Sequence, residues 1–256
     1  MKYKRYVLII AIALILFLVG KSYLTIQPEI NVIVIDPGHG GSKEKLYTYY
    51  GDEFKGNISS LIKVQSGNKE YYTEREEQTP IEKRKLMHTG DPGATYSKDN
   101  VTYFEKDINL GIANMLSEIL IEKYSVNSTR KDDRYIFLER RREISNKSRA
   151  DLFISIHQNS VAAECENLNN AEVYYNNIDL KDISELILNK LTANLDLNTG
   201  KIIENKNFAV LNTSINSMLI EVNFMCNEKN AKMLSNEENQ RKIAKTIADS
   251  LISYYN

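Results

Sequence analysis

A run of β-branched residues that ends in a glycine-rich loop constrains the fold of this chain more than any other feature. Residues 31–35 read Asn-Val-Ile-Val-Ile, and Asp-Pro-Gly-His-Gly-Gly follows directly at residues 36–41. An uninterrupted apolar run is typical of a strand buried on both faces, and the glycines let the backbone turn sharply where it ends. The sequence therefore predicts a buried strand that delivers His39 to one edge of a sheet.

Short apolar runs alternate with longer amphipathic segments along most of the chain, which is typical of an α/β domain. The expected helices are 107–124, 138–147, 183–195 and 241–254, and the expected strands are 152–156, 172–175, 208–211 and 218–222. A length of 256 residues suits one such domain with a substantial core. We therefore predict an α/β fold: a single domain with a mainly parallel central sheet flanked by helices.

The first 24 residues differ from the rest of the chain. Residues 6–20 carry no charge and follow Lys2, Lys4 and Arg5. A basic start before an apolar run is typical of a membrane-targeting segment. The length of the run falls between a signal-peptide core and a full span, so cleavage near residues 20–22 stays open, although we favour an uncleaved signal anchor over residues 1–24. In both cases residues 25–256 are expected on the extracytoplasmic side, attached to the membrane or secreted.

Charge and cysteine content exclude some functions and leave others open. Four of the 33 Lys and Arg residues and none of the 34 acidic residues lie in the first 24 positions, so the remainder has a net charge of −5. Its basic residues are scattered, which argues against a nucleic-acid partner. Cys165 and Cys226 are either a disulfide pair formed outside the cell or two incidental residues.

Residues 42–89 interrupt the alternation of predicted strands and helices. They are rich in charged residues and tyrosine, show no clear periodicity and contain several turn signals. We expect a long insertion into the domain, with a small hairpin around residues 59–64 and 71–73. The charged run at 74–85 is expected to form a solvated face.

The chain has three histidines, and two of them directly follow predicted strands. His39 follows the strand at 31–35 and His157 follows the strand at 152–156. Both are expected at the carboxyl edge of the sheet, where open α/β sheets place their sites. A catalytic zinc site needs three protein ligands and one open position. Glu105, at the start of a helix, is the best third candidate, although a glutamate there also suits the helix dipole by itself.

Glu221 lies within an otherwise apolar predicted strand, in the sequence Met-Leu-Ile-Glu-Val-Asn-Phe-Met at residues 218–225. Two interpretations are open for it. Either the side chain faces solvent by simple alternation, or it lies at the site as a general acid and base with a raised pKa. The apolar residues on both sides favour the second interpretation.

These motifs together resemble the zinc-dependent N-acetylmuramoyl-L-alanine amidases of the amidase type 3 family. The resemblance covers nearly everything after the apolar segment, and its motifs are at residues 35–41, 105–110, 129–130, 133, 141, 146, 150–159, 172–175 and 219–227. It implies that His39, Glu105 and His157 hold Zn²⁺ and that Glu221 is the catalytic glutamate. It also implies that the substrate is peptidoglycan, cleaved between N-acetylmuramic acid and L-alanine. Asn159 is expected either to bind substrate or to cap a loop.

Two departures from the family pattern concern the surroundings of the site. Asn223 stands where a glycine is common in relatives and Gln158 where a small or apolar residue is usual, so substrate fit near Glu221 and His157 is expected to differ. Residues 42–89 separate the His-Gly-Gly turn from the Asp-containing loop at 90–94, which follows that turn almost directly in relatives. The insertion is therefore expected beside the zinc site as a lid, a substrate clamp or a docking element for a partner.

Several alternatives remain open at this level. His88, near the end of the insertion, is a further candidate to approach the metal, and an activating protein partner could order the insertion before zinc binds. An amidase domain behind an anchor resembles the sporulation-specific enzymes that form muramic-lactam in spore cortex, whereas other relatives act in vegetative cell separation. An alternative of another class is a non-catalytic amidase-fold protein that binds peptidoglycan or scaffolds a partner.

Overall fold

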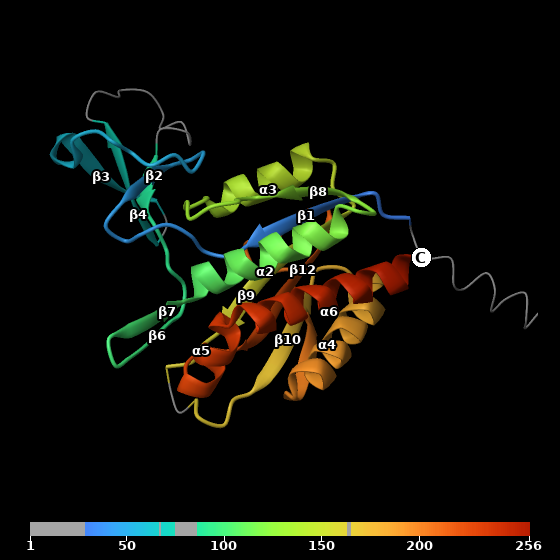
Figure 1. Cartoon of the computed structure of the whole chain (residues 1–256). Helices are drawn as coiled ribbons and strands as arrows, with labels where there is room; N and C mark the ends of the chain where they lie inside the picture. The colour runs from blue at the N-terminus through green and yellow to red at the C-terminus, as the bar shows by residue number, and fades with distance from the viewer. Residues whose placement is uncertain (1–28, 67, 75–85, 163–164) are drawn as a thin grey trace, which may run out of the picture.

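The fold is built on a six-stranded sheet that runs through the middle of the molecule (Figure 1). The computed structural model describes residues 29–66, 68–74, 86–162 and 165–256. The strands lie in the order β11-β10-β12-β9-β1-β8, with bounds Asn198–Glu204, Asn170–Tyr175, Asn216–Phe224, Leu152–Asn159, Val32–Pro37 and Ser125–Ser128. Neighbouring strands are parallel except for β10 and β12. The prediction of an α/β fold with a mainly parallel sheet is therefore confirmed.

Helices cover both faces of this sheet (Figure 1). The helices on one face are α2 (Glu105–Leu120), α4 (Lys181–Leu195) and α6 (Glu237–Tyr255), and α3 (Leu138–Lys147) lies on the other. Ile33 and Ile35 of β1 pack in the core beneath α2, α4 and α6, whereas Val34 packs in the second core with α3. Strand β1 is thus buried on both faces, which explains its uninterrupted apolar sequence.

Most of the expected elements are present with small shifts at their ends. Residues 208–211, which were expected to form a strand, form turns instead, so that prediction is wrong. Val210 and Leu211 are buried against Phe153 and Leu219 on the face of the sheet that α3 covers. These residues are therefore apolar because the loop that carries them packs onto the sheet, and not because they form a strand.

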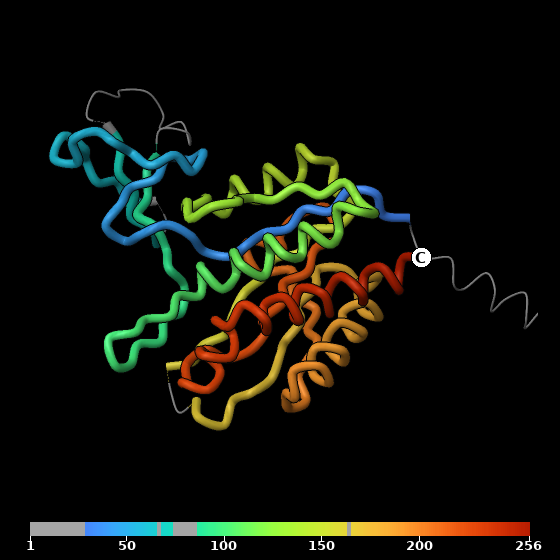
Figure 2. Tube along the Cα trace, viewed as in Figure 1, coloured from blue at the N-terminus to red at the C-terminus, as the bar shows by residue number. Residues whose placement is uncertain are grey.

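All four strands of a second sheet lie within residues 42–89, beyond one end of the central sheet (Figures 1 and 2). The strand order is β2-β5-β4-β3, with bounds Leu46–Thr48, Met87–Thr89, Lys69–Glu74 and Leu61–Ser66. The expected hairpin is present as the antiparallel pair of β3 and β4. The charged run at 74–85 falls almost wholly outside the described residues.

The inserted sheet is fixed to the α/β domain at its root and along one side. Gly40 and Asp91 exchange two backbone hydrogen bonds of 2.8 Å, so the points where the chain enters and leaves the insertion meet. A buried aromatic cluster joins the two parts, with members Tyr47, Tyr49, Tyr71, Tyr135 and Phe137. Burial of these five aromatic side chains stabilises the contact between the insertion and the domain.

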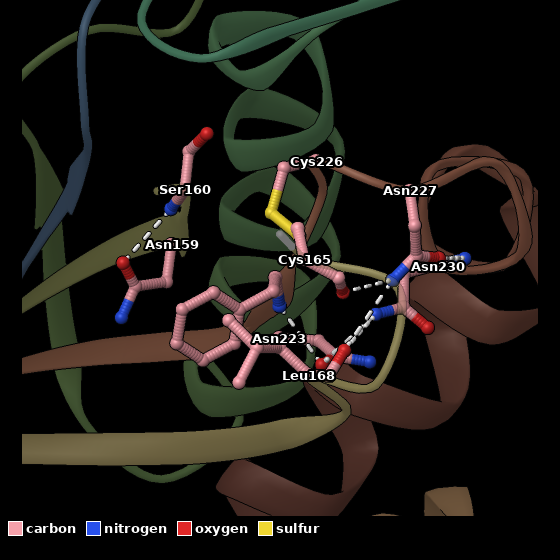
Figure 3. The surroundings of a disulfide bond; sticks show 9 residues. Asn159, Ser160, Cys165, Leu168, Asn223, Cys226, Asn227 and Asn230 are labelled. Atoms are coloured by element: carbon pink, nitrogen blue, oxygen red, sulfur yellow. Dashed lines mark hydrogen bonds between the residues drawn. A yellow bond between two sulfur atoms is a disulfide. The ribbon is translucent and has the colours of Figure 1, made fainter. Parts of the chain in front are cut away.

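A disulfide joins the loop after β9 to the residue stretch after β12 (Figure 3). The Cα atoms of Cys165 and Cys226 are 5.9 Å apart, so of the two alternatives the structure has the disulfide pair. Hydrogen bonds reinforce this attachment: the Nδ2 of Asn227 donates to the Cys165 carbonyl oxygen (3.2 Å), and that of Asn230 donates to the Leu168 carbonyl oxygen (2.7 Å). The loop is thereby held across the carboxyl ends of β9 and β12.

Replacing both cysteines by serine is expected to lower the free energy of unfolding by about 2–4 kcal/mol, because the disulfide restricts the unfolded chain. Its two residues are 61 positions apart, so the closed loop is long. Urea denaturation of the oxidised wild type, the reduced wild type and the double variant measures the effect. Equal unfolding midpoints for the oxidised and reduced wild type would contradict the expectation.

Within the described part of the chain, no helix is long and apolar enough to cross a membrane. The expected anchor at residues 1–24 lies outside the described residues. The described chain begins at the end of the central sheet opposite to the insertion, near the last turn of α6 (Figure 2).

Candidate active site

The loop after β1 holds His39 in a conformation that few side chains adopt. His39 has a φ of 59°, in the left-handed region. The guanidinium of Arg141 fixes this turn because it donates to the carbonyl oxygen of His39 (2.6 Å) and to a carboxylate oxygen of Asp36 (2.6 Å). Arg130 donates to the carbonyl oxygens of Pro37 (3.0 Å) and Gly38 (2.9 Å). Two buried arginines therefore hold the histidine in place.

The second histidine lies on the neighbouring strand, next to this loop. His157 belongs to the carboxyl end of β9, and its side chain is 17% exposed. Gly38 lies against its imidazole: a Cβ atom at that position would be 2.3 Å from two ring atoms. The ring has room only because residue 38 lacks a side chain, which gives this glycine of the Asp-Pro-Gly-His-Gly-Gly motif a structural reason.

Glu105 connects the two histidines. It is the first residue of α2, directly after the hairpin of β6 (Thr95–Lys98) and β7 (Val101–Phe104). Its Oε2 is 3.2 Å from Nε2 of His39, and its Oε1 is 3.0 Å from Nδ1 of His157. The backbone N–H groups of Ala94 and Gln158 also donate to this carboxylate, which is only 3% exposed. The structure thus brings together all three residues expected as ligands.

The contacts between these groups shift their pKa values in opposite directions. Burial alone would raise the pKa of Glu105, but hydrogen bonds from His157 and His39 hold it well below its usual range. Burial alone would lower the pKa of His39, but the carboxylates of Asp91 and Glu105 overcome this and raise it to about 10. Glu105 therefore supplies an ionised carboxylate in the metal-free protein, whereas His39 must lose its ring proton when a metal ion binds.

This donor set fits a zinc ion. The set consists of two imidazoles and one carboxylate, and their ligand atoms lie within 4.8 Å of one another. Two ligands about 2.0–2.1 Å from a tetrahedral ion are about 3.4 Å apart, close to the distances between Glu105 and the two rings. With three protein ligands, a fourth position stays open for water or substrate, which is the arrangement of catalytic zinc sites. The assignment of these residues as ligands stays a prediction.

Asp91 is a residue of this site that the sequence did not identify. Its Oδ2 is 2.8 Å from Nδ1 of His39, and the contact lowers the pKa of Asp91 to about 2 against the effect of burial. A carboxylate on Nδ1 orients the ring and leaves Nε2 directed at Glu105. The signal in the sequence was the Asp-containing loop at 90–94, but 52 positions separate the two residues.

Replacing Asp91 by asparagine is expected to weaken zinc binding about 10- to 100-fold, because the ring of His39 loses the carboxylate that orients it and increases its basicity. Competition with a zinc chelator of known affinity measures the change. Asp132→Asn is a matched control, since Asp132 pairs with Arg134 on the surface and does not contact the cluster. Equal zinc affinity for Asp91→Asn and the wild type would contradict this role.

Glu221 lies beside His157 in the sheet. Strands β12 and β9 pair Glu221 with His157 in register, and β10 places Glu172 on its other side. The side chain is partly buried, and its Oε2 is shielded from solvent and has no hydrogen-bond partner among the described residues. Burial raises the pKa of Glu221 to about 7, in opposition to the nearby imidazole of His157. The structure thus places Glu221 next to His157, and its role as general acid and base stays a prediction.

The raised pKa of Glu221 predicts a pH-dependent effect on stability. Its pKa is higher in the folded protein than in the unfolded chain, so ionisation of Glu221 destabilises the fold as the pH rises through the range between about 4.5 and 7. In zinc-free protein, Glu221→Gln is therefore expected to be about 1–3 kcal/mol more stable than the wild type at pH 8 and equal to it near pH 4. Urea denaturation at both pH values tests this, and a stability difference that is independent of pH would contradict it.

Two other candidates lie apart from the three clustered residues. The Nδ2 of Asn159 donates to Glu172 (3.1 Å), and its Oδ1 accepts from the N–H of Ser160 (2.8 Å), which is a loop-capping contact (Figure 3). His88 stacks on Tyr135 at 5.1 Å between ring centroids, within the aromatic cluster, and is not among the described residues that converge as metal ligands. The alternative that His88 approaches the metal is therefore not supported.

Gln158 and Asn223, the two departures from the family pattern, are both buried in hydrogen-bonded positions. Gln158 donates through Nε2 to Asn109 (3.1 Å), a neighbour of Glu105 on α2. Asn223 donates through Nδ2 to Asn169 (2.8 Å), in the loop that carries the disulfide. Both side chains thus support the elements around the site.

Comparison with known proteins agrees with this architecture. Residues 33–253 match the Amidase_3 family, described as N-acetylmuramoyl-L-alanine amidase. The chain belongs to this family. It is 31% identical over 157 residues to the uncharacterized protein YqiI of Bacillus subtilis (strain 168), across 59% of this chain and 75% of YqiI. It is 30% identical over 156 residues to the amidase LytC of the same strain, but this match spans only 31% of LytC.

A solved amidase has the same fold. The CwlD amidase from Clostridioides difficile, determined in complex with the GerS lipoprotein, superimposes with a TM-score of 0.63 at 27% identity, over 88% of this chain and 98% of CwlD. The family predicted from the motifs is therefore confirmed, and so is the class of enzyme, an N-acetylmuramoyl-L-alanine amidase. The family acts on the cell wall, so its substrate class is peptidoglycan.

Proposed function

We propose that this amidase is a zinc-dependent peptidoglycan hydrolase that cleaves the amide bond between N-acetylmuramic acid and the L-alanine of the stem peptide. The observation that carries the proposal is the convergence of His39, Glu105 and His157 at one end of the sheet, with Glu221 paired in register with His157. Membership of the amidase family supports the choice of bond.

In this proposal Glu221 is the group that moves protons. A carboxylate with a pKa of about 7 accepts a proton from the attacking water and then gives it to the amine that leaves. When bound to the three ligands, Zn²⁺ supplies Lewis-acid polarisation of the amide carbonyl and lowers the pKa of water. Asp91 keeps His39 in the orientation that directs its Nε2 to the centre of the cluster.

The proposal includes a place of action. Residues 1–24 act as a signal anchor or a cleaved signal, and residues 25–256 form the catalytic domain on the extracytoplasmic side, with residues 42–89 as an insertion. Peptidoglycan lies on that side of the membrane, so the targeting segment and the enzyme class agree. Removal of residues 1–24 is expected to leave the protein in the soluble fraction inside the cell, whereas the full chain is expected in the membrane fraction if residues 1–24 are an anchor and in the medium if they are cleaved.

We further propose that the enzyme acts in spore-cortex remodelling together with an activating protein partner. Its support is the likeness to CwlD, which was determined together with the GerS lipoprotein. Deletion of the gene in the organism of origin distinguishes the pathways: spores without muramic-lactam support the cortex role, whereas normal spores and unseparated vegetative cells support cell separation.

The experiment that tests the reaction uses the purified chain, zinc and muropeptides from isolated peptidoglycan. We expect mass spectrometry to detect peptides with a free L-alanine N-terminus together with glycans that retain the lactyl carboxylate. A chelator-treated sample is the control and is expected to release neither product. Cleavage at a different bond would contradict the proposal, and zinc-loaded protein that binds peptidoglycan without cleaving it would instead support a non-catalytic scaffold.

A further inference from the structure

The candidate metal centre opens into a groove that the inserted sheet helps to form. The groove has a volume of about 240 Å³ and is lined by His39 and His157 together with side chains from three other parts of the chain. The central sheet contributes Leu219, the loop at 205–215 contributes Phe208 and the insertion contributes Lys69, the first residue of β4. A ligand in this groove therefore contacts the metal centre and the insertion at the same time.

The charges that line the groove are paired, with one exception. Arg141 pairs with Asp36 at 2.6 Å, and His39 pairs with Asp91 at 2.8 Å. The ammonium group of Lys69 makes no hydrogen bond or ion pair with any residue that the structure describes, although Lys63 on the neighbouring strand pairs with Glu70 at 2.9 Å. Among the described residues, the groove thus has one unpaired positive charge, and it comes from the insertion.

The position of Lys69 is fixed by the packing of the insertion. Tyr71, two residues further along β4, lies in the aromatic cluster and stacks on Phe137 with 5.9 Å between ring centroids. Tyr135 belongs to the same cluster and also lines the groove. The lysine is therefore carried by a strand that is anchored to the wall of the groove, and not by a free surface loop.

The chemistry of the proposed substrate indicates what this charge recognises. The lactyl carboxyl of muramic acid is consumed in the scissile amide, and the N-acetylated sugars are uncharged, so the negative charges of the substrate lie on its peptide. The first of them is the carboxylate of the acidic residue that follows L-alanine. A lysine ammonium in the same groove as the metal centre forms a charge-assisted hydrogen bond with such a group.

We propose that Lys69 binds a carboxylate of the stem peptide, so that the insertion is a peptide clamp selecting acidic over amidated stems. This inference rests on the proposed amidase function and adds a specificity-determining residue to it. Several other lining side chains are apolar and suit the aliphatic part of the peptide, among them Leu138, Phe208, Val210 and Leu219. The carboxylate replaces water around an ammonium group that has no partner within the part of the chain that the structure describes.

The test compares N-acetylmuramoyl-L-alanyl-D-glutamic acid with N-acetylmuramoyl-L-alanyl-D-isoglutamine, each with its γ-carboxyl group blocked as a methylamide, so that the two compounds differ only in the charge of the α-carboxyl group. The zinc-loaded wild type is expected to cleave the acid with about tenfold higher kcat/KM than the amide, through a lower KM. Lys69→Gln is expected to raise KM for the acid about tenfold without changing kcat, and to leave the amide unaffected. Lys69→Arg is expected to retain the preference, and Lys63→Gln on the same hairpin is the matched control.

A binding measurement keeps the inference separate from the proposed reaction. Calorimetry with zinc-loaded Glu221→Gln, alone and combined with Lys69→Gln, gives the affinities for both ligands in the absence of turnover. The clamp is supported if the difference in affinity is lost only when Lys69 is replaced, whether or not the wild type cleaves the two compounds. Failure of the wild type to cleave either compound would count against the proposed amidase function and not against the clamp. An equal preference with and without Lys69, or no preference in the wild type, would overturn the inference.

Discussion

Replacing Glu221 by glutamine is expected to lower kcat for stem-peptide release about 10²- to 10⁴-fold, the usual contribution of a general acid and base. Glutamine has nearly the same shape but neither accepts the proton of the attacking water nor gives one to the leaving amine. Because Glu221 pairs with His157 across β12 and β9 and is not itself one of the three clustered residues, zinc content is expected to stay at one ion per chain. Initial rates with a dye-labelled peptidoglycan substrate measure the loss.

The matched control is Glu204→Gln, on edge strand β11 of the same sheet, where the carboxylate pairs with Lys206 at the surface. This variant is expected to retain wild-type kcat, since surface pairs of this kind contribute little. Glu221→Gln that binds zinc and still releases peptides at the wild-type rate would refute the assigned role of Glu221.

Removing any one of the three clustered side chains is expected to abolish zinc retention and, with it, measurable amidase activity. His39→Ala and His157→Ala each remove one ring nitrogen, and Glu105→Gln replaces the buried carboxylate that contacts both rings. A structural or catalytic zinc ion binds only while its ligand set is complete, and its binding energy stabilises the folded state. Zinc is therefore expected to raise the melting temperature of the wild type and of none of these variants.

The third histidine provides the control for this experiment. His88→Ala removes an imidazole from the aromatic cluster, where it stacks on Tyr135, and is expected to leave one zinc ion per chain. Inductively coupled plasma mass spectrometry of the four dialysed variants measures the content. Equal zinc content in His88→Ala and the three cluster variants would contradict the assignment of the ligands.

The parts of the fold that the sequence predicted are those with a strong apolar pattern. Strand β1 and helix α6 bury many apolar side chains, so their periodicity is visible. Strands β8 and β11 escaped prediction because they are the two edges of the sheet, where part of each strand stays exposed and polar. The segment at 208–211 was mistaken for a strand because a buried loop and a buried strand carry the same apolar residues.

The sequence predicts those site residues that directly follow a strand or begin a helix. His39, Glu105 and His157 lie in recognisable local motifs, and the parallel sheet brings the two histidines to one edge. Asp91 and Lys69 were not predictable, because their positions depend on how the insertion folds back: Gly40 pairs with Asp91, and β4 packs beside Phe137. Such contacts between distant segments leave no periodic signal in a single sequence.

The measurement that tests the central claim most directly is anomalous X-ray scattering from crystals of the zinc-loaded chain, collected on both sides of the zinc absorption edge. We expect one strong peak, about 2.0–2.2 Å from a ring nitrogen of His39, a ring nitrogen of His157 and a carboxylate oxygen of Glu105. A zinc peak bound elsewhere, or an intact cluster without a peak at saturating zinc, would contradict this expectation.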